Sequence, residues 1–215
     1  MSAAPPSSRR AKIVGAAVAV VLLALFAWQT YETVSSRPKM VREPVVSAIE
    51  RFGIDRAKDP RLPAPAIELA ALDGSRVSLA AARGQVVFVN FWATWCPPCR
   101  DEMPSMVALG QDLASRYPGQ FKMIAVSVDE DLAAIRSYFA APPFSGPPGA
   151  LTIARDADQS VTRAYYAQAR GFTPDIKFPE TYIVDKAGRL VAYVVGPRDW
   201  SDPAARAFLE ALIRS

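Results

Sequence analysis

An apolar run that leads into a pair of closely spaced cysteines constrains this chain more than any other feature. Val86–Trp92 carries no charge and does not alternate, which is typical of a strand buried on both faces. Cys96 and Cys99 follow, and 100–117 has the pattern of a helix. A cysteine at a helix N-terminus meets partial positive charge and free N–H groups, which stabilise its thiolate. We therefore expect a reactive Cys-x-x-Cys pair, with a structural disulfide or half of a zinc site as alternatives.

Composition narrows the chemistry of this pair. These are the only two cysteines among 215 residues, and the chain has no histidine. Zinc and copper sites draw on Cys and His together, so we expect no metal. Covalent haem attachment needs a histidine where Arg100 stands, and a Cys-His catalytic pair cannot form. We expect no cofactor. The net charge of +4 is spread without a basic block, so we expect no nucleic-acid binding.

The N-terminal region has the charge pattern of a membrane anchor. Arg9, Arg10 and Lys12 precede an apolar stretch, and residues 13–31 approach the ~20 residues that span a bilayer. The positive charges predict that residues 1–12 are cytoplasmic and that the rest of the chain lies outside. We expect a single span in a bacterial inner membrane and a catalytic domain in the periplasm. A cleaved secretory signal is the alternative.

The remaining chain divides into a linker and one domain. Residues 32–63 are rich in Pro, Ser, Lys and Arg and predict a linker, and residues 64–215 predict a single domain. Within it, Asp73-Gly74 is a hairpin turn signal. Strands alternate with helices, which predicts a layered α/β domain with an N-terminal β-hairpin and leaves the strand order open. The expected strands are 67–69, 77–79, 86–92, 121–127, 151–153, 181–184 and 190–195, and the expected helices are 100–117, 129–140, 159–168 and 203–213.

Two segments resemble a known family. Phe91–Pro104, FWATWCPPCRDEMP, closely resembles the active-site segment of the thioredoxin-fold proteins TlpA, ResA and DsbE (CcmG). Pro179–Asp185, PETYIVD, is similar to their second landmark, a cis-proline followed by a strand. The resemblance runs from about Ala64 to the C-terminus. It implies a thioredoxin-like fold, a central mixed sheet flanked by helices, held outside the membrane by an anchor or lipid.

The same resemblance implies an activity and partners. It implies a protein disulfide reductase that acts through a dithiol on disulfide-containing proteins. The substrates it suggests are apocytochrome c or copper-site assembly proteins, in cytochrome c or cytochrome oxidase maturation. The electron donor it suggests is a transmembrane thiol relay.

The cysteines and the prolines between them receive distinct predicted roles. Cys96 is the expected nucleophile, exposed near the helix N-terminus, and Cys99 the buried resolving thiol. Pro97 and Pro98 are tolerated in a first helical turn, where their missing N–H groups have no intrahelical partner. They remove two donors to the Cys96 thiolate and leave the Cys99 N–H as the nearest one. A less stabilised thiolate makes a more reducing pair, so we expect a reductant. Trp95 would flank the site or simply pack.

Glu102 is the candidate proton carrier. It follows Cys99 by three residues and therefore shares its helix face. It matches the position of an active-site glutamate in ResA-type proteins, where burial would raise its pKa and let it take the Cys99 proton. An exposed carboxylate favoured by the helix dipole is the alternative. Asn90 stands where thioredoxin has a buried aspartate, which favours Glu102.

Three further residues are expected, on the resemblance, to form the substrate groove with Trp95. Pro179 is expected to be cis and to lie against the cysteine pair, where it aligns an extended substrate. Phe178 is bulkier than the residue often found at its position. Glu180 is expected to contribute to partner recognition or proton handling.

Two rival functions use the same sulfur atoms. A peroxiredoxin-like peroxidase shares the fold, but such enzymes precede the attacking cysteine with a characteristic Pro and Thr, and the proline is absent from Trp92–Trp95. A non-enzymatic module with a structural disulfide is the other rival. An oxidase, which introduces disulfides, would use the same residues as a reductase.

Overall fold

The computed structural model describes residues 21–29, 52–171 and 176–215. The chain divides into two units, with the boundary between Glu43 and Pro44. In the first unit, residues 21–29 are helical and their large apolar side chains are exposed. Across the described ranges, no helix combines the length and apolar character that crossing a membrane requires. Of the anchor predicted at 13–31, residues 13–20 and 30–31 lie outside these ranges.

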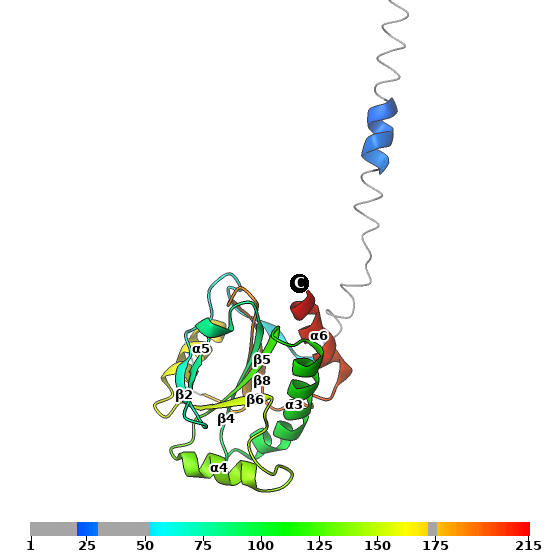
Figure 1. Ribbon diagram of the computed structural model, residues 1–215. Helices are drawn as coiled ribbons and strands as arrows, with labels where there is room; N and C mark the ends of the chain where they lie inside the picture. Colours follow the sequence, from blue (N-terminus) through cyan, green and yellow to red (C-terminus); the bar gives the residue numbers. More distant parts are fainter. Residues whose placement is uncertain (1–20, 30–51, 172–175) are drawn as a thin grey trace, which may run out of the picture. The chain divides into compact units, whose positions relative to one another are not determined.

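A mixed eight-stranded sheet forms the centre of the second unit (Figure 1). The strand order is β1-β8-β7-β4-β5-β6-β2-β3. β4 and β5 pair in parallel, as do β5 and β6, whereas the other neighbours are antiparallel. The strands are β1 (Asp55–Arg56), β2 (Glu68–Ala71), β3 (Arg76–Ser78), β4 (Val86–Trp92), β5 (Phe121–Ser127), β6 (Leu151–Arg155), β7 (Glu180–Val184) and β8 (Leu190–Val195).

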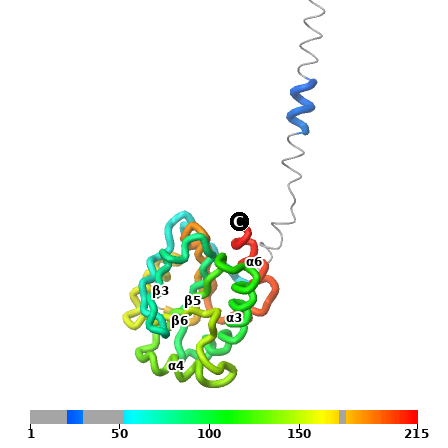
Figure 2. Tube along the Cα trace, viewed as in Figure 1, coloured from blue at the N-terminus to red at the C-terminus, as the bar shows by residue number. Residues whose placement is uncertain are grey.

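Helices cover both faces of the sheet. Side chains alternate along β4, so Phe88 and Trp92 pack with α3, α4 and α6, whereas Val89 and Phe91 pack with α5. The trace in Figure 2 shows α6 lying beside α3. The sheet is therefore the middle layer of three. The helices are α3 (Pro97–Arg116), α4 (Leu132–Ala140), α5 (Ser160–Arg170) and α6 (Pro203–Arg214), with a short 3-10 helix η2 at Ala80–Ala82.

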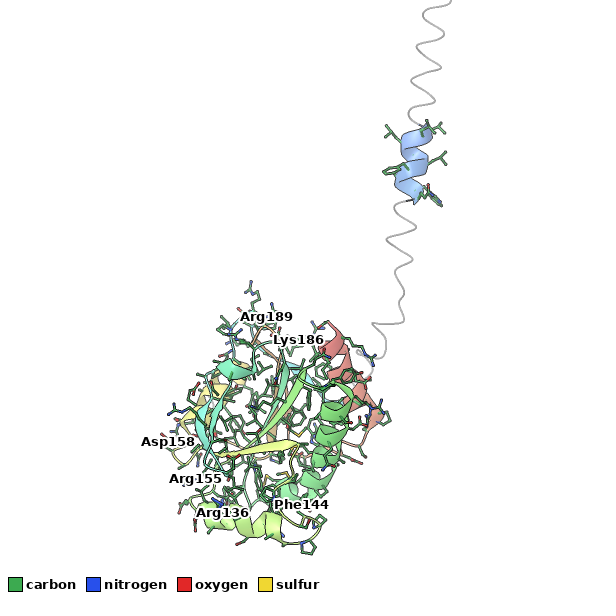
Figure 3. The ribbon with its side chains drawn as sticks, in the orientation of Figure 1. Arg136, Phe144, Arg155, Asp158, Lys186 and Arg189 are labelled. Atoms are coloured by element: carbon green, nitrogen blue, oxygen red, sulfur yellow. A yellow bond between two sulfur atoms is a disulfide. The ribbon has the colours of Figure 1, made fainter. Side chains whose placement is uncertain are left out.

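The β2–β3 hairpin is tied to α4. Arg136, labelled in Figure 3, extends from α4, and its Nη2 donates to the Leu72 carbonyl oxygen at 2.9 Å. The predicted N-terminal hairpin is confirmed, since β2 and β3 pair antiparallel across the Asp73-Gly74 turn. The predicted order of strands and helices from β2 onward is confirmed too.

The predicted linker is too long at its C-terminal end. Phe52 and Ile54 are 4% and 6% exposed and belong to the core. β1 then pairs with β8, and Pro63 forms a bridge with Arg189. The correction has a physical reason: β8 would otherwise leave its outer edge unpaired, and this short segment covers it. Three buried side chains, Phe52, Ile54 and Ala57, in a stretch rich in Pro and Arg give too weak a pattern to reveal this from sequence.

Candidate active site

The cysteine pair lies where β4 ends and α3 begins. Cys96 is the N-cap of α3, with extended backbone angles (φ −96°, ψ 102°), and Pro97 and Pro98 occupy the first two helical positions. Proline fits there because the first N–H groups of a helix have no intrahelical acceptor. The Cys96 N–H donates to the Ala93 carbonyl, which closes the turn between strand and helix. The predicted strand-to-helix placement is thus confirmed.

The two cysteines form a disulfide with an S–S distance of 2.05 Å. The Cys99 N–H donates to Cys96 Sγ at 3.4 Å. This is the donor expected to remain once the prolines have removed the others.

Exposure differs from the prediction at Cys96. Cys96 is only 5% exposed and Cys99 is fully buried, so the expectation of an exposed nucleophile is wrong for this disulfide state. The reason is that Cys96 faces the core cluster that also contains Cys99 and Met103. The asymmetry between the cysteines nevertheless holds, because the remaining accessible surface of the pair belongs to Cys96. Trp95 beside it is 63% exposed.

Asp129 holds the turn before Cys96, and sequence reasoning missed it. It lies just beyond β5 and is 2% exposed. Its carboxylate accepts from the Thr94 N–H at 3.0 Å, from the Thr94 hydroxyl at 2.6 Å and from the Ser127 hydroxyl at 2.6 Å. The signal was available: parallel strands end at the same edge of a sheet, so an acidic residue after β5 lies beside the end of β4.

Glu102 is buried beneath the first turn of α3, at 3% exposure. Its Oε1 accepts from Asn90 Nδ2 at 2.8 Å, and its Oε2 accepts from the Arg198 N–H at 3.1 Å and from Trp200 Nε1 at 3.2 Å. Burial raises the pKa of this carboxyl from 4.5 to about 7, and the hydrogen bonds limit the rise. The group therefore exchanges a proton near neutral pH, as a carrier must.

The loop after β8 supplies both hydrogen-bond donors to Oε2 of Glu102. Arg198 also donates from Nε to the Phe52 carbonyl at 2.8 Å, and the Trp200 ring packs against Phe52 and Phe88. An open depression of about 490 Å³ lies between α3 and this loop, and Glu102 forms part of its wall. No local signal marked Arg198 or Trp200 in the sequence, because both meet Glu102 across nearly a hundred residues.

Phe178 and Pro179 lie on the cysteine side of the molecule. The Phe178–Pro179 bond is cis, as expected. The Phe178 ring meets the Trp95 ring edge to face, with 6.0 Å between centroids. The Pro179 carbonyl accepts from the Gly196 N–H at 2.9 Å. An exposed aromatic residue from the turn before the disulfide therefore adjoins the predicted groove residue.

Glu180 does not line the groove, which corrects its expected place among the substrate-binding residues. Its neighbour Thr181 accepts from Asn90 on the face that carries Glu102, so Glu180 points to the opposite face. It is fully buried and forms an ion pair with Arg170 at 2.6 Å. Its carboxylate cannot touch a substrate in this structure. Burial raises its pKa, while hydrogen bonding from Tyr182 and the charge of Arg170 act in the opposite direction.

A disulfide at a helix N-terminus on a three-layer sheet, with a buried carboxyl one turn further along the helix and a cis-proline just before the neighbouring strand β7, defines a thioredoxin-fold thiol:disulfide oxidoreductase. A profile of the Redoxin family matches residues 58–209. The chain belongs to this family, and within it to the TlpA, ResA and DsbE-like proteins that the two motifs resemble.

Individual relatives agree with this assignment. The thiol-disulfide oxidoreductase ResA of Bacillus thuringiensis (strain Al Hakam) is 30% identical over 134 residues, which cover 62% of this chain and 68% of ResA. The thioredoxin-like protein YneN of Bacillus subtilis (strain 168) is 27% identical over 184 residues, which cover 82% and 85%. A thiol:disulfide interchange protein of the thioredoxin family from Chlorobium tepidum TLS has a solved structure that superposes with a TM-score of 0.55. It is 32% identical, and the match covers 73% of this chain and 99% of that structure.

Proposed function

We propose that this oxidoreductase reduces disulfides in partner proteins outside the cytoplasm, from an N-terminal membrane anchor. One observation carries the redox part of the proposal: the Cys96–Cys99 pair stands at the N-terminus of α3, and Glu102, three residues after Cys99 on the same helix, is buried with its pKa raised to about 7. The charge pattern of residues 1–31 supports the anchor and the periplasmic location. We propose the order cytoplasmic N-terminus, single inner-membrane span, linker and catalytic domain.

The proposed reaction is two thiol–disulfide exchanges. The Cys96 thiolate attacks one sulfur of the substrate disulfide, which forms a mixed disulfide and releases the other sulfur as a thiolate. Cys99 then gives its proton to the Glu102 carboxylate and attacks Cys96 Sγ. The substrate leaves fully reduced, after its sulfur takes up a proton, and the Cys96–Cys99 disulfide of the structure remains. Two electrons have passed from the cysteine pair to the substrate, and a dithiol donor must return them.

The direction of electron flow follows from the prolines. Pro97 and Pro98 leave the Cys99 N–H as the backbone donor to Cys96 Sγ. A weakly stabilised thiolate disfavours the reduced pair, which makes it a better reductant. A standard potential near the about −120 mV of strong oxidants would contradict this. We propose apocytochrome c or copper-site assembly proteins as substrates and a transmembrane thiol relay as donor.

Trapping tests the proposed function. The full chain carrying Cys99→Ser can form the mixed disulfide but cannot resolve it. In membranes of the host cell this variant should accumulate disulfide-linked adducts with other proteins, and a thiol reductant should release them. The matched control, Cys96→Ser with Cys99→Ser, should form none. Absence of adducts with the single variant would mean that the disulfide is structural.

A further inference from the structure

A second polar cluster lies on the face of the sheet away from the cysteines, and the reaction described above does not use it. Glu180 is at its centre, and both of its oxygens are occupied. Arg170 Nη1 donates to Oε1 at 2.6 Å, and the Tyr182 hydroxyl donates to Oε2 at 2.5 Å. Removing a charged pair from water carries a free-energy cost. A cluster of this kind therefore calls for a role that apolar side chains would not fill.

Tyr166, on α5, connects this cluster to the backbone just before the cis-proline. Its hydroxyl donates to the Lys177 carbonyl and accepts from the Lys177 N–H, the latter at 2.8 Å. The Arg170 guanidinium lies over the Tyr166 ring, 5.8 Å from its centroid. α5 thus holds the chain on both sides of Phe178 and Pro179, at Lys177 before them and at Glu180 after them.

The segment held in this way is the one that faces the site. Phe178 meets Trp95 beside the disulfide, and the Pro179 carbonyl is fixed by the Gly196 N–H. Phe178 also packs against the apolar clusters on both faces of the sheet, and Lys177 and Glu180 hold the backbone on either side of it. The contacts made by α5 therefore help to position the groove residue that meets Trp95.

The neighbouring Tyr165 shows that a tyrosine on α5 can pack in the core without using its hydroxyl. Tyr165 is as deeply buried as Tyr166 and also packs against Tyr182. In the part of the chain that the structure describes, its hydroxyl has no hydrogen-bond partner. A tyrosine ring on α5 can therefore be buried in this fold without a hydrogen bond from its hydroxyl. The Tyr166 hydroxyl, by contrast, bonds to the Lys177 backbone and also interacts with Glu180.

We propose that Tyr166 is a positioning residue. Its hydrogen bonds to the Lys177 backbone hold Phe178 against Trp95. The position of Phe178 in turn governs how fast the cysteine pair reacts with a disulfide carried on an extended peptide. This inference rests on the proposed function and adds a specificity determinant to it. The rate of reaction with a small disulfide, which does not contact the groove, should not depend on the hydrogen bonds between Tyr166 and Lys177.

Two matched variants test this, Tyr166→Phe and Tyr165→Phe, each in the reduced full chain in detergent. One probe is an extended peptide whose single cysteine is in mixed disulfide with thionitrobenzoate, and the other is the small disulfide 5,5′-dithiobis(2-nitrobenzoate). Release of thionitrobenzoate gives both second-order rate constants. Tyr166→Phe should lower the ratio of the peptide constant to the small-disulfide constant about tenfold, as misplaced binding groups do. Tyr165→Phe should keep the wild-type ratio.

Amide hydrogen exchange supplies a readout that needs no reaction. In the oxidised full chain, Tyr166→Phe should lower protection at Lys177 about tenfold, because its N–H loses its acceptor, and Tyr165→Phe should not. The inference is overturned if Tyr166→Phe keeps the wild-type ratio or if both variants lower it equally. A wild-type chain that reacts with neither probe contradicts the proposed function instead, and the exchange result then decides by itself whether Tyr166 holds the segment.

Discussion

At the scale of single residues, two buried glutamates are held in different ways. Glu180 has a cation in direct contact, Arg170, and takes part in holding a loop. Glu102 receives neutral donors, the side chains of Asn90 and Trp200 and the backbone N–H of Arg198. Desolvation raises the pKa of both, but only Glu102 lies under the cysteine pair. It is therefore the carboxyl suited to exchange protons with Cys99.

The raised pKa of Glu102 predicts a pH-dependent stability. The folded protein binds the proton more tightly than the unfolded chain, so the contribution to stability is complete below pH 4.5 and is lost as pH rises towards 7. A rise from 4.5 to about 7 corresponds to roughly 3 kcal/mol. Urea unfolding of the oxidised wild type and of Glu102→Gln should show the wild type losing about this much relative to the variant over that range. A constant difference between the two from pH 4 to pH 8 would show that Glu102 does not titrate there.

Site residues could be predicted from sequence where the signal was local, or where a second motif resembled the family, as at Pro179. The cysteine spacing and the three-residue step to Glu102 place these side chains on one helix, whatever the rest of the chain does. Arg198 and Trp200 reach the site from distant segments that no local pattern identifies. Asp129 could be placed from its position at the end of β5, but only if β4 and β5 are taken as parallel neighbours. Glu180 was misplaced for a related reason, because the direction of a residue at a strand end depends on register.

At the scale of secondary structure, the hydrophobic pattern within each element was sufficient to predict most of the strands and helices. Val86–Trp92 and Leu190–Val195 have the predicted bounds. Several other elements extend beyond their predicted ends by a few residues, as α5 does to Arg170. Strand order could not be predicted, since hydrophobic pattern identifies a buried strand without naming its neighbours. β1 was missed because two residues show no periodicity.

Packing of the N-terminal segment predicts a stability effect at Phe52. Its ring lies in the core, 5.3 Å from the Trp200 ring between centroids. Phe52→Ala should lower the free energy of unfolding by about 3 kcal/mol, as truncations of buried aromatics do. Leu62, which is 48% exposed, provides the control, and Leu62→Ala should cost less than about 0.5 kcal/mol. If urea unfolding showed a similar loss of stability for both variants, the segment around Phe52 would belong to the linker and not to the folded core.

At the scale of the whole molecule, the proposed anchor would decide where the chemistry takes place. We expect the full chain in a bacterial host to stay with the membrane after an alkaline carbonate wash and to retain its N-terminus by mass spectrometry. A membrane-impermeant thiol reagent should label Cys96 in reduced whole cells. Exchanging Arg9, Arg10 and Lys12 for Glu should weaken that labelling, because basic residues hold the N-terminus inside. A shorter protein in the wash supernatant would instead indicate a cleaved signal.

The proposed reaction requires two cysteines of different reactivity: Cys96 attacks the substrate disulfide and Cys99 resolves the mixed disulfide. The most direct measurement is alkylation of the reduced full chain by iodoacetamide as a function of pH, with each modified cysteine identified by mass spectrometry. We predict that Cys96 is modified first, with a pKa below the about 8.5 of a free cysteine, while Cys99 is spared. Equal modification of both cysteines, or a Cys96 no more reactive than an ordinary thiol, would contradict it.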